Sequence, residues 1–124
     1  MRESSEYRVG TNKHTYDLPG GRLTVGEHFL DALTRKVKEE TDLEIVIGKP
    51  VTVSEWRPIV HDEEWQVVGI FFECQAKTDA ITLSSDHDHF EWIKPTDYEK
   101  YPLIDNLKPV FETYIKDVLM TSSV

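Results

Sequence analysis

The chain has 124 residues, of which 39% are hydrophobic and 30% are charged. This composition is typical of one soluble globular domain and excludes disordered and fibrous proteins. The 23 acidic residues outnumber the 14 basic residues and give a net charge of -9, so the average field repels polyanions and we expect no nucleic-acid partner.

No segment predicts export or insertion into a membrane. The sequence lacks a run of roughly 18 consecutive apolar residues, and residues 1–5 contain no apolar signal region. The lone Cys74 has no internal disulfide partner, and the apolar run at 67–72 just before it predicts a buried, unreactive thiol. We therefore expect a cytoplasmic protein that does not contact membranes.

The first third of the chain predicts two short strands, a tight turn and a helix. Residues 7–9 and 14–18 have extended patterns, and Pro19-Gly20-Gly21 then imposes a turn. Thr24 and Glu27 form a capping-box pair at the start of the predicted helix. Its apolar positions recur at helical spacing and are Phe29, Leu30, Leu33 and Val37, in a pattern that ends at about Thr41.

The rest of the chain predicts further strands and a second helix. The segments between the two helices alternate in polarity or are rich in β-branched and aromatic residues. The last helix begins at about Lys108, with Pro109 in its first turn. The order of elements therefore predicts an α+β fold, with two helices on a largely antiparallel or mixed sheet. The expected strands are residues 43–47, 51–56, 65–76, 81–83 and 89–93, with a polar turn at 61–64 and a short helical turn at 95–97.

The first helix carries two adjacent carboxylates where helix stability does not favour them. Glu40 falls within the apolar arc of the helix, so its side chain is expected to face the buried side. Glu39 and Glu40 both lie in the last turn, where the helix dipole disfavours anions by about 0.3 to 1 kcal/mol each. A solvated helix end and a bound divalent cation both account for this pair, and the glycine turn at 19–21, which lets the backbone approach a ligand, favours the cation.

These residues resemble the Nudix box, in which a glycine, an arginine and several glutamates recur at fixed spacing. The resemblance runs from 21 to 43, and residues 18–21 and 86–92 are similar to two further family motifs. It implies a single Nudix-like domain over residues 1–124, an α/β/α sandwich with a mixed sheet and two main helices. The positions that match the box are Gly21, Glu27, Arg35, Val37, Glu39, Glu40 and Leu43.

The resemblance implies a metal-dependent hydrolase for a small nucleotide. Water is expected to attack a phosphorus of a nucleoside diphosphate linked to another moiety, with Mg²⁺ or Mn²⁺ as the cofactor. The general base is expected among residues 86–89, since a histidine that titrates near neutrality suits proton abstraction, although such a polar run is also typical of an exposed loop. The expected metal ligands are the Gly21 carbonyl, Glu27, Glu39 and Glu40, and for Glu27 the capping role is an equal alternative. The expected catalytic residues are Arg35, Glu39, Glu40 and His87, and the expected substrate-binding residues are Gly20, Gly21 and Asp86.

Three features depart from the family pattern. Lys36 stands where the family has a glutamate that ligands metal or serves as base, which leaves open a catalytically impaired nucleotide-binding or sensor module. Asp42 replaces the closing glycine, a mild change because aspartate tolerates a left-handed backbone. The long apolar strand that precedes the box in the family is missing or truncated, so either the chain starts upstream of Met1 or a partner, such as the second subunit of a homodimer, completes the sheet edge.

Overall fold

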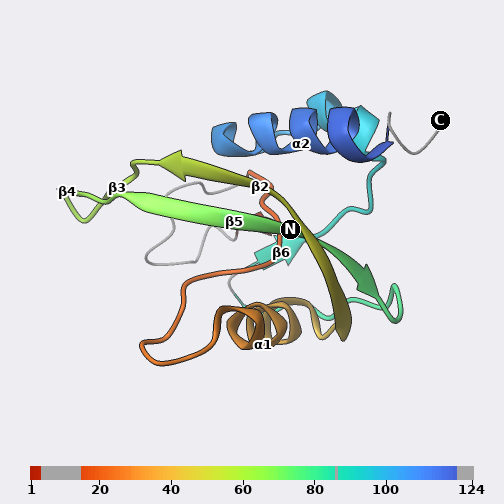
Figure 1. The fold of residues 1–124 in the computed structure, drawn as a ribbon, viewed down its shortest axis with the longest axis horizontal. Helices are drawn as coiled ribbons and strands as arrows, with labels where there is room; N and C mark the ends of the chain where they lie inside the picture. The colour runs from red at the N-terminus through yellow and green to blue at the C-terminus, as the bar shows by residue number, and fades with distance from the viewer. Residues whose placement is uncertain (4–14, 86, 120–124) are drawn as a thin grey trace.

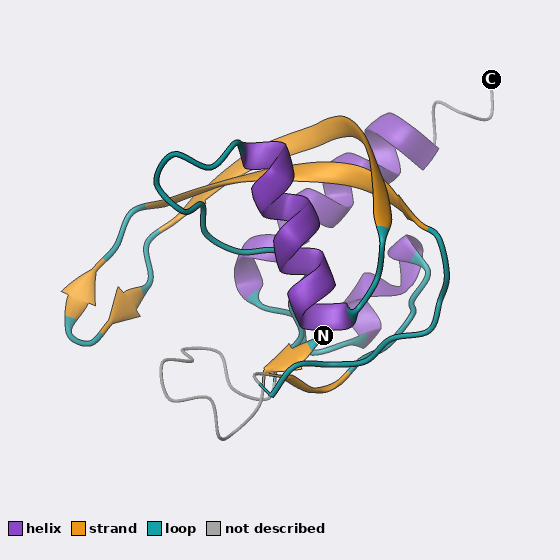
Figure 2. Cartoon of the chain, turned by 90° about the horizontal axis from the view of Figure 1, so that it is seen from below, coloured by secondary structure: helices purple, strands orange, loops and turns teal. Residues whose placement is uncertain are grey.

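A long antiparallel ribbon lies between two helices. The computed structural model describes residues 1–3, 15–85 and 87–119. Strand β2 (Ile45–Trp56) pairs with β5 (Val67–Ala76), helix α1 (Phe29–Thr41) lies on one side of this ribbon, and α2 (Lys108–Tyr114) lies on the other (Figure 1). Seen from below, α1 lies across the ribbon (Figure 2). The predicted α+β class with α/β/α layers is confirmed.

Helix α1 begins later than the capping-box pattern predicts. Its N-cap is His28, whose Nδ1 accepts a hydrogen bond from the Leu30 amide at 3.2 Å. Gly26 has a φ of 85°, a left-handed conformation that cannot continue a helix from Thr24. The pair still forms as a separate turn, because the Thr24 amide donates to the Glu27 carboxylate at 3.3 Å and the Glu27 amide donates to the Thr24 carbonyl at 2.9 Å.

Asp42 ends helix α1 in a left-handed conformation. Its φ is 60°, and its backbone amide donates to the Lys38 carbonyl at 2.9 Å. The carboxylate of Asp42 also pairs with the Lys38 ammonium at 2.8 Å. The expectation that an aspartate can take the backbone position of the closing glycine is confirmed.

The segment predicted as a strand at 81–83 closes the end of α1 instead. The Thr82 amide donates to the Thr41 carbonyl at 3.0 Å, and the Ser84 amide donates to the Glu40 carbonyl at 3.2 Å. Carbonyls in the last turn of a helix have no partner within the helix and must find one elsewhere. This segment therefore hydrogen-bonds to a helix end and not to a sheet, and the strand prediction is wrong.

The strands predicted at 43–47 and 51–56 form one continuous strand, β2. The register with β5 shifts on both sides of Pro50, which has no amide hydrogen to give to the ladder. The predicted strand at 65–76 is confirmed as β5, which begins two residues later than expected.

The polar turn predicted at 61–64 is confirmed as the tip of a hairpin. Strand β3 (Ile59–Val60) pairs with β4 (Glu63–Glu64). His61 and Asp62 between them have φ values of 50° and 64°, the left-handed pair that a two-residue hairpin turn requires.

A second small sheet joins the N-terminus to the segment after the ribbon. Strand β1 (Arg2–Glu3) pairs antiparallel with β6 (His87–His89), so the strand predicted at 89–93 lies earlier in the chain. Tyr16 makes only an isolated parallel bridge to Leu103, where residues 14–18 predict a strand. The strand predicted at 7–9 lies outside the described residues.

The helical turn predicted at 95–97 and the helix predicted from about Lys108 are both present. The expected turn at 95–97 is part of a 3-10 helix, η1 (Pro95–Lys100), and a second one, η2 (Asp105–Leu107), leads into α2. Helix α2 begins at Lys108 with proline in its first turn and continues as a π-helix, η3 (Ile115–Leu119). Within the described part of the chain, no helix is long and apolar enough to cross a lipid bilayer.

The core lies where each helix meets the ribbon. Leu107 is completely buried, and Thr41 is the buried polar residue of α1, with its hydroxyl donating to the Val37 carbonyl at 2.6 Å. The prediction that Cys74 is buried is wrong, because it lies near the end of β5 with its side chain exposed. The other buried apolar residues are Met1, Ala32, Val37, Leu43, Ile104 and Val110.

Candidate active site

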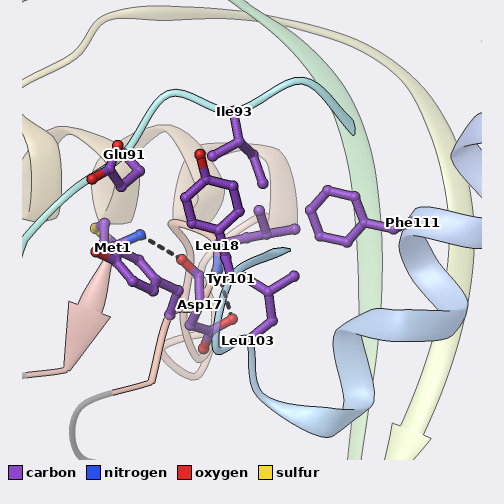
Figure 3. Close-up of a pocket in the computed structure, with 9 residues that line it drawn as sticks. Met1, Asp17, Leu18, Glu91, Ile93, Tyr101, Leu103 and Phe111 are labelled. Atoms are coloured by element: carbon purple, nitrogen blue, oxygen red, sulfur yellow. Dashed lines mark hydrogen bonds between the residues drawn. The ribbon is translucent and has the colours of Figure 1, made fainter. Parts of the chain in front are cut away.

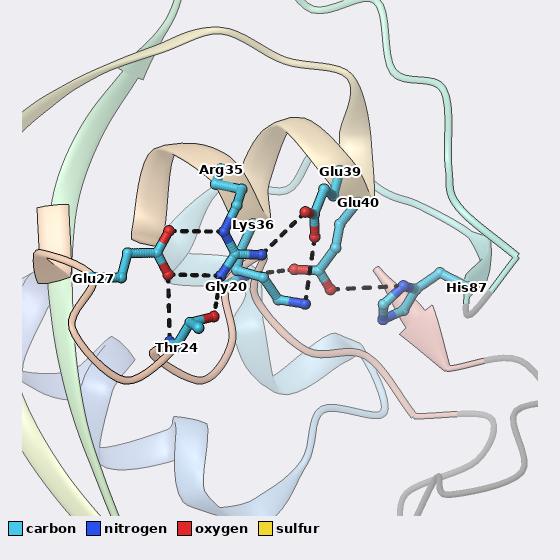
Figure 4. Close-up of polar contacts among 8 residues, drawn as sticks. All are labelled: Gly20, Thr24, Glu27, Arg35, Lys36, Glu39, Glu40 and His87. Carbon is cyan, nitrogen blue, oxygen red and sulfur yellow. Dashed lines mark hydrogen bonds and ion pairs between the residues drawn. The ribbon is translucent and has the colours of Figure 1, made fainter. Parts of the chain in front are cut away.

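The candidate site lies where the glycine turn meets the last turn of α1 (Figure 4). The Gly20 amide donates to Oε1 of Glu40 at 2.9 Å. Gly20 has a φ of 150°, a conformation that side chains disfavour. The Glu40 side chain is 14% exposed, which confirms the expectation that this carboxylate faces inward from the helix. The turn and the helix end are thus joined by a carboxylate.

Lys36 packs against the same turn. A methyl group at Gly21 would collide with Cε of Lys36, so the aliphatic part of the lysine lies directly over the glycine. The ammonium lies 3.6 Å from Oε2 of Glu39. The absence of a side chain at Gly21 therefore makes room for the residue that departs from the family pattern.

Arg35 links the loop before α1 to the helix. Its Nε and Nη2 donate to the two oxygens of Glu27, each at 2.9 Å, and its Nη1 donates to Oε1 of Glu39 at 3.0 Å (Figure 4). These hydrogen bonds lower the pKa of Glu27 to about 2 and raise the pKa of Arg35. Arg35 thereby holds Glu27 as an anion and ties the loop before α1 to the helix.

Replacing Arg35 by methionine is expected to return the pKa of Glu27 toward its ordinary value of 4.5. Stability contributed by a depressed carboxyl pKa is fully present above about 4.5 and is lost as the pH falls through about 2. The variant lacks this contribution, so its deficit in stability relative to the wild type should shrink as the pH falls from 4.5 to 2. An NMR titration of the Glu27 carboxyl carbon measures this. Arg57→Met removes an arginine that pairs with Glu55 at 3.1 Å and should leave Glu27 unchanged. If the pKa of Glu27 were unchanged in Arg35→Met, Arg35 would not be the group that holds Glu27 as an anion.

The structure places His87, which follows the ribbon in the chain, beside the carboxylate of Glu40. Nδ1 of His87 lies 3.9 Å from Oε2 of Glu40, and the His87 side chain is only 11% exposed. His89 is exposed, and its Nε2 lies 3.0 Å from Oε1 of Glu91. Asp86 lies outside the described residues. Of these two histidines, His87 is the one beside Glu40.

The donors at this site fit a divalent cation. Glu27, Glu39 and Glu40 carry three negative charges against the two positive charges of Arg35 and Lys36, which leaves one negative charge. Among the described residues, no three acidic, histidine or cysteine side chains already converge as ligands. Mg²⁺ is typically held by one or two carboxylates together with water and substrate phosphates. A largely buried Glu40 beside the backbone of a glycine turn supplies oxygen donors of that kind.

A small cavity that the sequence did not predict lies next to the residues that precede the glycine turn. Its volume is about 60 Å³, its walls are mostly apolar, and Asp17 and Glu91 contribute carboxylates (Figure 3). Leu18, two residues before Gly20, belongs to it. No periodic pattern marks these residues, because they come from separate loops and from α2. The apolar walls are formed by Met1, Tyr16, Leu18, Ile93, Leu103 and Phe111, with Tyr101 beside them.

Known proteins are similar to this chain in sequence and in fold. The NUDIX domain family matches residues 2–114. Nucleoside triphosphatase NudI from Escherichia fergusonii is 31% identical over 93 residues, which are 69% of this chain and 66% of that protein. The chain thus spans just under two thirds of the length of this curated relative.

Two solved structures have the same fold. The MutT protein from Methanosarcina mazei Go1 has a TM-score of 0.82 at 24% identity and covers 94% of this chain and 80% of its own. A C. elegans Ap4A hydrolase has a TM-score of 0.66 at 16% identity and covers 90% of this chain and 80% of its own. Because the family match extends over nearly the whole chain, from the first strand to the last helix, this protein belongs to the NUDIX domain family.

Proposed function

We propose that this protein hydrolyses a phosphoanhydride bond of a nucleoside triphosphate or of another nucleoside diphosphate derivative. The observation that carries the proposal is the carboxylate of Glu40, held by the Gly20 amide at 2.9 Å and largely shielded from solvent. The name of the NudI relative, a nucleoside triphosphatase, supports a triphosphate as the substrate class.

Mg²⁺ or Mn²⁺ is the proposed cofactor. Glu40 and the Gly21 carbonyl would hold the ion directly, and Glu39 and Glu27 would add negative charge around it. When bound, such an ion neutralises charge on the phosphate and lowers the pKa of the attacking water. Arg35 acts as a positioning residue, because it holds both Glu27 and Glu39 in place through three hydrogen bonds.

His87 is the proposed general base. Its ring lies beside Glu40, with 3.9 Å between Nδ1 and Oε2, which places the imidazole at the proposed metal site. Gly20 and Gly21 are the other proposed substrate-binding residues. The space beside Gly20 is open to a phosphate oxygen, and at Gly21 the stem of Lys36 lies over the turn. Asp86 is retained as a proposed substrate-binding residue on the family resemblance alone.

The nucleoside end of the substrate is proposed to approach the cavity beside Leu18. Apolar walls favour the flat face of a base or the carbon skeleton of a sugar, while Asp17 and Glu91 are acceptors for amino or hydroxyl groups. The sequence-based expectations of a cytoplasmic location, a homodimer and no nucleic-acid partner stay predictions.

A substrate panel tests this function. The purified chain is incubated with nucleoside triphosphates, dinucleotide cofactors and nucleotide sugars in Mg²⁺ or Mn²⁺, and the release of phosphate, pyrophosphate or mononucleotide is measured. We expect turnover of at least one nucleotide and its loss in EDTA. A second candidate, a nucleotide-binding or sensor module, is favoured by Lys36 beside Glu39. Nucleotide binding without turnover of any panel member would replace the hydrolase proposal by this one.

A further inference from the structure

We propose that Lys36 is a built-in cation of this site, which takes the place of one divalent ion at Glu39 and binds a substrate phosphate directly. The inference rests on the proposed function, since it concerns the same phosphate-binding site. It predicts that the protein loads fewer metal ions than the same site would load with a carboxylate at position 36.

The contacts of Glu39 are the first observation. Its Oε1 accepts a hydrogen bond from Arg35 at 3.0 Å, and its Oε2 lies 3.6 Å from the Lys36 ammonium. Each oxygen of this carboxylate therefore already faces a cation that belongs to the protein. A metal ion at Glu39 would have to displace Lys36 or be repelled by it.

The position of Lys36 over the glycine turn is the second observation. The Lys36 stem lies against Gly21, and Glu40, four residues later in the same helix, accepts from the amide of Gly20. Two consecutive residues of the turn thus contact two side chains that are neighbours on one helix face. A phosphate bound to an ion at Glu40 would lie beside the lysine, whose ammonium has donors to spare for phosphate oxygens.

The charge of the cluster is the third observation. With Lys36, the three carboxylates and two cations of the site sum to one negative charge, and with glutamate at this position they would sum to three. Affinity for hard cations rises with the number of ligand charges, so the lysine lowers the capacity for metal. It also supplies a positive charge that needs no metal to reach the phosphate.

Lys38 offers a matched control on the same helix. Its ammonium pairs with Asp42 at 2.8 Å, beyond the end of α1, and its side chain is 50% exposed. Lys38→Met removes the same charge from the same helix without touching the glycine turn, so it reports the effect of net charge alone.

Counting Mn²⁺ by electron paramagnetic resonance, without nucleotide, tests the first half of the proposal. Lys36→Glu should bind one more Mn²⁺ per chain than the wild type, and Lys36→Met should bind Mn²⁺ at least about tenfold more tightly. Lys38→Met should behave as the wild type. Equal Mn²⁺ numbers in the wild type and Lys36→Glu, with equal melting temperatures, would overturn the proposal.

Calorimetric titration of inorganic pyrophosphate in EDTA tests the second half. We expect the wild type and Lys36→Arg to bind pyrophosphate, and Lys36→Met to bind at least about tenfold more weakly. Undetectable binding by the wild type, or equal binding by Lys36→Met, would overturn a direct phosphate contact. Neither titration measures turnover, so a failure here is distinct from a failure of the substrate panel.

Discussion

Glu40→Gln is expected to lower metal-dependent hydrolysis by at least about a thousandfold, measured as kcat for the best substrate of the panel. The amide oxygen of glutamine can still accept the hydrogen bond from Gly20, so the turn should keep its shape. The negative charge that attracts the cation is lost, and charge stabilisation by a bound metal is worth several kcal/mol of the barrier. The same change should also weaken Mn²⁺ binding.

The control for this variant is Glu44→Gln. Glu44 lies three residues beyond the end of α1, where it pairs with Lys77 across an exposed 3.7 Å ion pair. Removing its charge should leave kcat within about twofold, because exposed ion pairs contribute little. If Glu40→Gln retained the activity of this control, the carboxylate at the glycine turn would not be the metal ligand.

Leu107→Ala is expected to destabilise the fold by about 2 to 5 kcal/mol, the usual cost of removing a buried leucine side chain. Leu107 has no exposed surface, and it ends η2, the short helix that leads into α2. The truncation should therefore leave a cavity between the C-terminal helices and the ribbon. Urea unfolding followed by circular dichroism measures the change.

Leu23→Ala is the matched control for the core. Leu23 lies in the loop between the glycine turn and α1, and its side chain is 59% exposed. Its truncation should change the free energy of unfolding by less than about 0.5 kcal/mol. A similar loss in both variants would mean that Leu107 is not the centre of this part of the core.

Much of the candidate site could be predicted because it lies within one stretch of sequence. Helical spacing alone placed Glu40 on the inward face of α1, and the Pro19-Gly20-Gly21 turn pointed to its partner. The identity of each contact could not be predicted in this way. Arg35 donates back to Glu27, which lies in a turn before the helix. The left-handed Gly26 keeps this turn out of the helix, whereas the capping-box pattern predicts that the helix already starts there.

The strand errors have a different cause. The residues at 81–83 alternate in polarity as a strand would, but the amides of Thr82 and Ser84 donate to carbonyls at the end of α1, about forty residues earlier in the chain. Local patterns do not contain such distant acceptors. The cavity was missed for the same reason, because its walls come together only through the packing of α2 and the loops.

The segment that closes α1 also sets the spacing within the candidate site. The Ser84 amide is tied to the carbonyl of Glu40, and the Ser84 carbonyl accepts from the amide of His87 at 3.3 Å. Two hydrogen bonds thus fix the distance between the proposed base and the end of α1. Insertion of a single residue between Ser84 and His87 would lengthen this connection. It would separate the imidazole of His87 from the carboxylate of Glu40, although neither side chain had changed.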